Sequence, residues 1–198
     1  MAYLITGGAG FIGSHVAERL LEQDKQVVIL DNFNDYYDPE LKRQNMEKLS
    51  RFSNVYLFEG DVRDTGLLDE IFASHDIMHI AHLAAMAGVR ASVAQTQLYM
   101  DVNLSGTMNM LEMAQRHAVN QFVFASTSSV YGETQTLPFV ETDAADQPLA
   151  PYPASKRAAE ILAHTYTHLF DLDVTVLRFF NVYGPSGRPD MMPLRLMD

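Results

Sequence analysis

A tyrosine and a lysine, Tyr152 and Lys156, stand four residues apart in the segment YPASK. Residues with this spacing lie on one face of a helix, so the phenol and the ammonium can address one spot. A tyrosine that acts as a base at neutral pH needs its pKa lowered by about three units, and a nearby positive charge favours that. The pair predicts proton transfer to and from a hydroxyl, although this spacing also occurs by chance on helix surfaces.

A second polar cluster, Ser126, Thr127, Ser128 and Ser129, follows an apolar segment that we expect to form a strand over 121–126. The strands of a parallel sheet end at one rim, where ligands bind. Hydroxyl groups at this rim can exchange hydrogen bonds with the hydroxyls of a ligand. The alternative is an ordinary turn rich in hydroxyl side chains.

A glycine-rich turn, TGGAGFIG, lies between an expected strand and an expected helix near the N-terminus. Gly7 allows a sharp turn, Gly10 allows the close approach of a pyrophosphate, and Gly13 allows the helix to pack closely on the sheet. The amides of Phe11 and Ile12 then face the phosphates, where the helix dipole also favours negative charge. The turn predicts a dinucleotide site.

The acidic residue Asp31 follows the next expected strand, residues 27–30. In this position a carboxylate can accept hydrogen bonds from the adenosine ribose of a dinucleotide. Asn32 stands where an arginine would be needed to bind a 2′-phosphate, so NAD is favoured over NADP.

Strand and helix patterns alternate along the rest of the chain. Expected helices begin at Pro39 and after Asp64, and two more are expected over about 92–117 and 152–170. Further strands are expected over 54–59, 78–83, 121–126 and 174–179. The pattern predicts the α/β class, with a Rossmann-like, doubly wound parallel sheet flanked by helices. We expect a cofactor-binding domain over 1–180, and over 181–198 the start of a substrate-binding region that is truncated.

Composition narrows the class of function. The chain of 198 residues has a net charge of −11, which argues against nucleic acid and against an anionic membrane as partners. It has no cysteine, so thiol chemistry and thiolate metal sites are excluded. His79 and His82 are expected on opposite faces of a strand, and we predict no metal site. We see no membrane span and no signal peptide, and we expect a cytoplasmic protein.

Taken together, these segments resemble the extended short-chain dehydrogenase/reductase family, and within it the UDP-glucuronate 4-epimerases. The resemblance covers the whole chain. The matching segments are TGGAGFIG (6–13), DNFNDYYDPELKR (31–43), GDVRD (60–64), HLAAMAGVR (82–90), STSSVYG (126–132), YPASK (152–156), RFFNVYG (178–184) and GRPDM (187–191). The segments DNFNDYYDP and GRPDM are the most specific, and they are similar to the branch that acts on uronates.

The resemblance implies roles for individual residues. Tyr152, Lys156 and Thr127 would be catalytic, with Tyr152 as base and acid. The cofactor would contact Gly7, Gly10, Phe11, Ile12, Gly13, Asp31, Asn32, Asp61, Val62, Leu83, Ala84, Ala85, Ala87, Asn103, Tyr152, Lys156 and Phe180. The substrate would contact Arg90, Thr127, Ser128, Asn181 and Arg188.

The resemblance also implies a reaction. Tyr152 would take the proton of the sugar 4′-hydroxyl while C4′ gives a hydride to NAD, and the 4-keto sugar would turn before the hydride returns to its other face. Sister 4,6-dehydratases and decarboxylases use a carboxylate beside the threonine, whereas this chain has Ser128 and Ser129, which favours epimerisation.

Two questions concern the chain as a whole. Members of the family are substantially longer, so a module that binds NAD without turnover is the alternative to an enzyme. The family also pairs two helices into a four-helix bundle, and the apolar surplus on 92–117 and 152–170 predicts a homodimer through these helices.

Overall fold

The computed structural model describes residues 1–189, and the chain forms two compact units. The first unit comprises residues 1–84 together with the chain from residue 181 onward, and the second comprises residues 85–180. Each is described by itself below.

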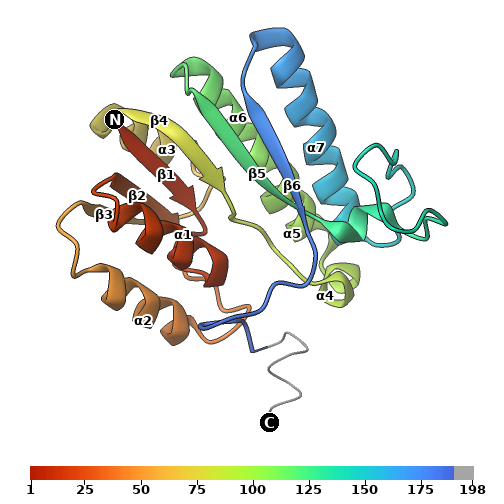
Figure 1. The fold of residues 1–198 in the computed structure, drawn as a ribbon, viewed down its shortest axis with the longest axis horizontal. Coiled ribbons are helices and arrows are strands. Elements are labelled where there is room, and N and C mark those ends of the chain that lie inside the picture. The colour runs from red at the N-terminus through yellow and green to blue at the C-terminus, as the bar shows by residue number, and fades with distance from the viewer. Residues whose placement is uncertain (190–198) are drawn as a thin grey trace. The chain divides into compact units, whose positions relative to one another are not determined.

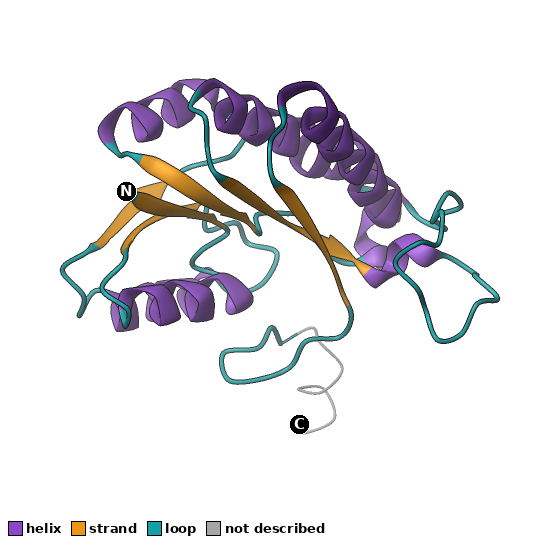
Figure 2. Ribbon diagram, turned by 45° about the horizontal axis from the view of Figure 1, so that its top comes forward, coloured by secondary structure: helices purple, strands orange, loops and turns teal. Residues whose placement is uncertain are grey.

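The first unit alternates strands and helices. Its elements are β1 (Ala2–Thr6), α1 (Phe11–Leu21), β2 (Gln26–Asp31), α2 (Pro39–Leu49), β3 (Val55–Glu59), α3 (Thr65–Ser74) and β4 (Ile77–His82). The strands pair in parallel in the order β3-β2-β1-β4, and α1 and α2 lie on one face with α3 on the other (Figures 1 and 2). The chain runs outward from β1 through β2 to β3 and then crosses back to β4 on the other side of β1, so a ligand crevice is expected where β1 and β4 end.

The core of this unit forms between β1, β2 and the helices α1 and α2. Ile5 and Ile29 on the strands are fully buried and pack with Ala17, Leu21 and Leu49 from the helices. Capping follows the sequence signals, since the Asp64 carboxylate accepts a hydrogen bond from Leu67 N–H (3.0 Å) and the Asp38 carboxylate accepts one from Glu40 N–H (2.9 Å).

The second unit contains a parallel strand pair and a layer of helices. Its elements are α4 (Val89–Ala94), α5 (Thr96–Met100), a π-helical turn η1 (Asp101–Ser105), α6 (Gly106–Arg116), β5 (Gln121–Thr127), a 3₁₀ turn η2 (Ser128–Tyr131), α7 (Pro151–Phe170) and β6 (Val174–Phe179). Strands β5 and β6 pair in register, with Phe124 opposite Val176, and α6 lies beside α7 (Figure 1).

The prediction of one long helix over about 92–117 was wrong. The helical region begins earlier, at Val89, and is interrupted at Gln95, whose backbone leaves helical geometry (φ −132°, ψ 38°). It widens into the π turn η1 before α6 begins. The π turn contains Asn103, which is fully buried and donates a hydrogen bond to the Met86 backbone oxygen, outside its own helix.

The α/β, Rossmann-like, doubly wound class is confirmed. Parallel strands alternate with helices, and in the first unit the helices cover both faces. The expected boundary between residues 180 and 181 stays a prediction, and residues 190–198, where part of GRPDM falls, lie outside the described residues. Among residues 1–189, no helix combines the length and the apolar character that a bilayer crossing needs.

Candidate functional site

The glycine turn brings the ends of β1 and β4 together. Gly7 has a left-handed backbone (φ +70°), and a Cβ atom there would lie 2.8 Å from the backbone nitrogen of Ala84. The Thr6 hydroxyl accepts a hydrogen bond from Ala84 N–H (3.2 Å) and lies 2.7 Å from Nδ1 of the buried His82. Leu83 and Ala84, both predicted cofactor residues, are therefore held against the turn.

The N-terminus of α1 is open to a ligand. No side chain caps it at Gly10, and its first turn contains no acidic residue. A Cβ atom at Gly10 would lie 3.3 Å from the Gly7 carbonyl oxygen, whereas one at Gly13 would lie 2.3 Å from the same oxygen. Gly13 is thus required for the turn itself, and Gly10 leaves free space in front of the amides of Phe11 and Ile12. The arrangement fits a pyrophosphate.

Asp31, the last residue of β2, lies directly behind this turn and is 6% exposed. One carboxylate oxygen accepts a hydrogen bond from Ala9 N–H (3.1 Å) and the other accepts one from Phe33 N–H (2.9 Å). Each oxygen retains a second lone pair, so the carboxylate can still accept a hydrogen bond from a ribose hydroxyl.

Two polar residues on the inner face of α2 also belong to this region, and the sequence reasoning missed them. The Lys42 ammonium donates to the backbone oxygen and to Oδ1 of Asn34 (both 3.0 Å) and lies 3.9 Å from Asp31. Burial lowers the pKa of Lys42, and Asp31 opposes this effect. Asn45 donates to the Ala9 carbonyl oxygen (3.0 Å). A signal was available, because both side chains fall on the helix face that should be apolar.

Asn32, Asp61 and Val62 form the next part of the same rim. The Asn32 amide donates to Asp61 (2.9 Å), and the Arg63 guanidinium donates to both Asp61 oxygens (2.8 and 2.9 Å). These hydrogen bonds from Arg63 are the main reason that the pKa of Asp61 falls to about 2. Val62 is buried beside them. The structure therefore brings Asn32, Asp61 and Val62 together, as expected of one binding surface.

In the second unit, Asn103 holds the loop that carries Ala85 and Ala87. Its Oδ1 accepts from Met86 N–H (2.8 Å), and its amide group donates to the Met86 oxygen (3.0 Å) and to the Ser155 hydroxyl (2.9 Å). Both amide hydrogens are used within the protein, and the side chain has no exposed surface. Asn103 therefore shapes the loop and links it to α7. It would affect a bound cofactor through the position of this loop and not by touching the cofactor itself.

Tyr152 and Lys156 lie one turn apart near the start of α7, as their spacing predicts. The Tyr152 ring is half-buried and packs edge-on against Tyr99, with ring centroids 6.1 Å apart. Lys156 is 2% exposed, and its ammonium lies 4.2 Å from the centroid of the Phe124 ring. Burial lowers the pKa of Lys156 to about 7, and the charge of Glu160 works in the opposite direction.

The hydroxyl cluster after β5 divides into different environments. Thr127 is buried at the end of the strand, and its hydroxyl accepts from Ser129 N–H (3.1 Å). Ser128 is half-buried at the start of η2. The Ser126 hydroxyl instead donates to the Glu160 carboxylate, so this side chain is directed into the protein and away from any ligand.

The remaining predicted substrate residues, and the predicted cofactor residue Phe180, are distributed over both units. Arg90 is exposed on α4, and Phe180 is exposed with its ring 5.5 Å from that of Phe139. Asn181 is exposed in the first unit. Arg188, also in the first unit, places its guanidinium 5.3 Å from the centroid of the Tyr36 ring.

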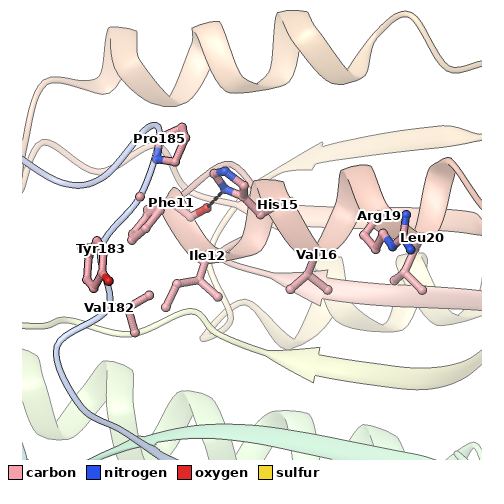
Figure 3. A pocket seen from close by; sticks show the side chains of 10 residues that line it. Phe11, Ile12, His15, Val16, Arg19, Leu20, Val182, Tyr183 and Pro185 are labelled. Carbon is pink, nitrogen blue, oxygen red and sulfur yellow. Dashed lines mark hydrogen bonds between the residues drawn. The ribbon is translucent and has the colours of Figure 1, made fainter.

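A further pocket of about 480 Å³ lies on the outer side of α1 (Figure 3). Val182, Tyr183 and Pro185 line it opposite Phe11 and Ile12 (Figure 3). The lining is mostly apolar, and its ionisable side chains are His15 and Arg19. Within residues 1–189, no three histidine, cysteine, aspartate or glutamate side chains come together as a metal site would require.

The fold and the site define an α/β protein with an open glycine turn for a dinucleotide and a Tyr-x-x-x-Lys pair on a separate helix. The family model described as GDP-mannose 4,6 dehydratase matches residues 4–197, and the chain belongs to that family. The predicted resemblance to extended short-chain dehydrogenases/reductases is confirmed.

Known proteins similar to this chain include epimerases and dehydratases. UDP-glucuronate 4-epimerase 3 of Arabidopsis thaliana is 48% identical over 95% of this chain and 44% of its own length. The Bacillus cereus UDP-glucuronic acid 4-epimerase, solved with UDP-glucuronic acid and NAD, is 37% identical, with a TM-score of 0.89 over 100% of this chain and 62% of its own. DesIV, a dTDP-glucose 4,6-dehydratase of Streptomyces venezuelae solved with NAD, is 31% identical, with a TM-score of 0.89 over 98% of this chain and 60% of its own. The chain thus spans about half of the curated relatives it matches.

Proposed function

We propose that the first unit binds NAD. The open N-terminus of α1 would hold the pyrophosphate through the amides of Phe11 and Ile12, and Asp31 would accept from the adenosine ribose. Asn32, Asp61 and Val62 would border the adenine, and the Bacillus cereus relative has been solved with NAD. The observation that supports this proposal is the pairing of an uncapped glycine turn with a buried carboxylate directly behind it.

We further propose that the complete protein epimerises UDP-glucuronate at C4′ to UDP-galacturonate. Tyr152 would take the proton of the 4′-hydroxyl and later return it, Lys156 would favour the phenolate by its charge, and Thr127 would hold the sugar oxygen. When bound, NAD would accept the hydride from C4′ and give it back. Lys156 supports this role because it stands one helical turn from Tyr152 and its ammonium is buried against Phe124 rather than extended into solvent.

The family model and the neighbour DesIV raise a 4,6-dehydratase as the second candidate. Elimination across C5 and C6 needs an additional acid and base. The residues that follow Thr127 are Ser128 and Ser129, with Val130 and Tyr131 after them in η2, so this turn carries no carboxylate. Epimerisation, which needs a single proton-transfer residue, is the better fit.

The uronate itself would be recognised by arginine. We propose that Arg188 binds the carboxylate, since guanidinium and carboxylate pair through two parallel hydrogen bonds. Arg90, Ser128 and Asn181 would contact the rest of the sugar nucleotide. Ala84, Ala85 and Ala87 would line the cofactor, and Phe180 would border the nicotinamide. Residues 1–180 would be the NAD domain, and the substrate region would begin at 181. A cytoplasmic location also stays a prediction.

A homodimer is the proposed assembly. On α7, Ile161 (55% exposed) and Leu169 (62% exposed) lie two turns apart on one face. Met108, on the neighbouring helix α6, is also exposed. Such an apolar stripe on adjacent helices suits the pairing of two copies into a helix bundle.

One incubation tests the reaction. The protein is given UDP-glucuronate and NAD, and the products are separated into galacturonate, pentose and dehydrated sugars. Galacturonate as the product, lost in Tyr152→Phe, supports the proposal, whereas a 4-keto-6-deoxy sugar indicates the dehydratase. Calorimetry with NAD and then UDP-glucuronate identifies the remaining alternative, a chain that binds NAD and no sugar nucleotide.

A further inference from the structure

A buried ion cluster lies on α7 one turn beyond Lys156. Its centre is Glu160, which is 5% exposed and stands on the same helix face as Tyr152 and Lys156. No role for Glu160 was expected from the sequence.

The carboxylate of Glu160 is held from three directions. Arg178 on β6 donates to both oxygens, through Nε (3.1 Å) and Nη2 (2.9 Å). Arg157 donates from the preceding turn of α7 (2.9 Å), and the Ser126 hydroxyl on β5 donates as well. A buried carboxylate with this many donors keeps its charge, and Arg178 and the other donors lower the pKa of Glu160 against the effect of burial.

The charge of Glu160 also acts on Lys156, which stands one turn away on the same helix. Its ammonium faces the Phe124 ring, a weak substitute for water, and burial alone favours the neutral amine. Because the pKa of Lys156 is about 7, a small electrostatic change moves the side chain between its two forms at neutral pH.

The elements packed against α7 carry several other charged or titratable groups. They are Arg90 on α4, Tyr99 on α5, Asp101 on η1, Glu112 and Arg116 on α6, Tyr131 on η2 and Arg178 on β6. Of the described residues, Glu160 is the one whose charge raises the pKa of Lys156.

We propose that Glu160 is a positioning residue that keeps Lys156 positively charged, and that Arg157 and Arg178 fix Glu160 in place while limiting its influence. Its consequence for catalysis rests on the proposed function, because a charged Lys156 is what favours the phenolate of Tyr152. Glu160 itself touches neither substrate nor cofactor in this account.

The charge of Lys156 can be measured without any activity. The chain has only four lysines, Lys25, Lys42, Lys48 and Lys156, so a protein labelled with ¹³C-lysine gives four side-chain signals to follow during a pH titration by NMR. The Lys156 signal is assigned by its loss in Lys156→Arg.

Two substitutions should move this titration in opposite directions. Glu160→Gln removes the negative charge and should lower the pKa of Lys156 by about one unit, a tenfold loss of proton affinity. Arg157→Gln removes a positive charge that is paired with Glu160, so the Glu160 charge acts more strongly on Lys156 and the pKa of Lys156 should rise. Glu112→Gln, the same chemical change at an exposed site on α6, serves as the control and should leave it unchanged.

The opposite signs separate this inference from simple damage to the fold. Shifts in the same direction for Glu160→Gln and Arg157→Gln, or no shift in either, overturn it. If Glu160→Gln does not fold, Arg157→Gln decides: a raised pKa of Lys156 supports the proposal and an unchanged or lowered one refutes it. An unsubstituted chain without turnover would argue against the proposed enzyme and leave the titration result intact.

In an active preparation, the same variants give a second readout. Glu160→Gln should move the acidic limb of the pH profile of kcat to higher pH, with little change in KM. The reason is that Lys156 then loses its positive charge more readily and no longer favours the phenolate of Tyr152. A purely structural role for Glu160 would lower the rate at every pH without moving the limb.

Discussion

Replacement by alanine should have different effects at two glycines of the turn after β1. Gly13→Ala should lower the stability of the fold, and Gly10→Ala should weaken the binding of NAD. A Cβ atom at Gly13 would lie 2.3 Å from the Gly7 carbonyl oxygen and 2.7 Å from the Gly8 Cα atom. Both neighbours are backbone atoms, so the clash cannot be relieved by a side-chain rotation. At Gly10 the nearest atoms would be 3.3 and 3.9 Å away, and the backbone there (φ −73°) suits alanine.

The magnitudes follow from these distances. In Gly13→Ala, the helix propensity gained is about 1 kcal/mol. Overpacking against rigid backbone costs typically about 1–3 kcal/mol and more where atoms overlap this closely, so the clash wins. For a chain of this size each kcal/mol lowers Tm by about 2–4 °C, and we expect a fall of several degrees. Gly10→Ala should cost less than about 1 kcal/mol, the difference between glycine and alanine at an N-cap.

Ligand binding should show the opposite ranking. The methyl group of Gly10→Ala occupies the space in front of the α1 amides, where the pyrophosphate must approach. We expect its Kd for NAD to rise at least about tenfold, or about 1.4 kcal/mol. Calorimetric titration with NAD and thermal unfolding of both variants measure the two effects. A Gly10→Ala variant that binds NAD normally, or that unfolds as early as Gly13→Ala, would refute the reasoning.

Three further substitutions test other parts of the structure. Lys42→Met removes both bonds to Asn34 and the charge next to Asp31, and should destabilise the protein by about 1–3 kcal/mol in urea titrations and weaken NAD binding, whereas Lys48→Met, at an exposed position of the same helix, should do neither. The pKa of Asp61, about 2 in the folded chain against an ordinary 3.8, means that its carboxylate stabilises the fold above about pH 4 and loses this effect as the pH falls toward 2; Asp61→Asn should lose about 1–2 kcal/mol at pH 6 and correspondingly less at pH 3. Leu169→Glu should convert a dimer into a monomer in light scattering, and a dimer that persists would contradict the proposed interface.

Local signals in the sequence predicted much of the first unit. The glycine turn, the helix start at Pro39 and the cap at Asp64 depend on residues close together in the chain, and all three are confirmed. The strand patterns succeeded for a similar reason, because short apolar runs between turn residues leave few alternatives.

Polar contacts between distant residues could not be predicted in this way. Asn45 bonds to a carbonyl 36 positions earlier, and Asn103 bonds to Ser155. Such hydrogen-bond partners can be identified only when the three-dimensional arrangement of the helices and strands is known. The π turn at residues 101–105 was not predicted either, and it contains Asn103, whose side chain bonds to the loop at Met86.

The charge of Lys156 shows most clearly what spacing alone leaves open. The YPASK segment predicts that a lysine faces the tyrosine, and this spacing is equally compatible with a solvated ammonium that is always charged. In the folded chain, burial against Phe124 lowers the pKa of Lys156 to about 7, and the charge of Glu160, one turn further along, opposes this effect without cancelling it. The chemistry proposed for Tyr152 therefore depends on a balance between desolvation and one buried ion cluster, and the motif by itself specifies neither of them.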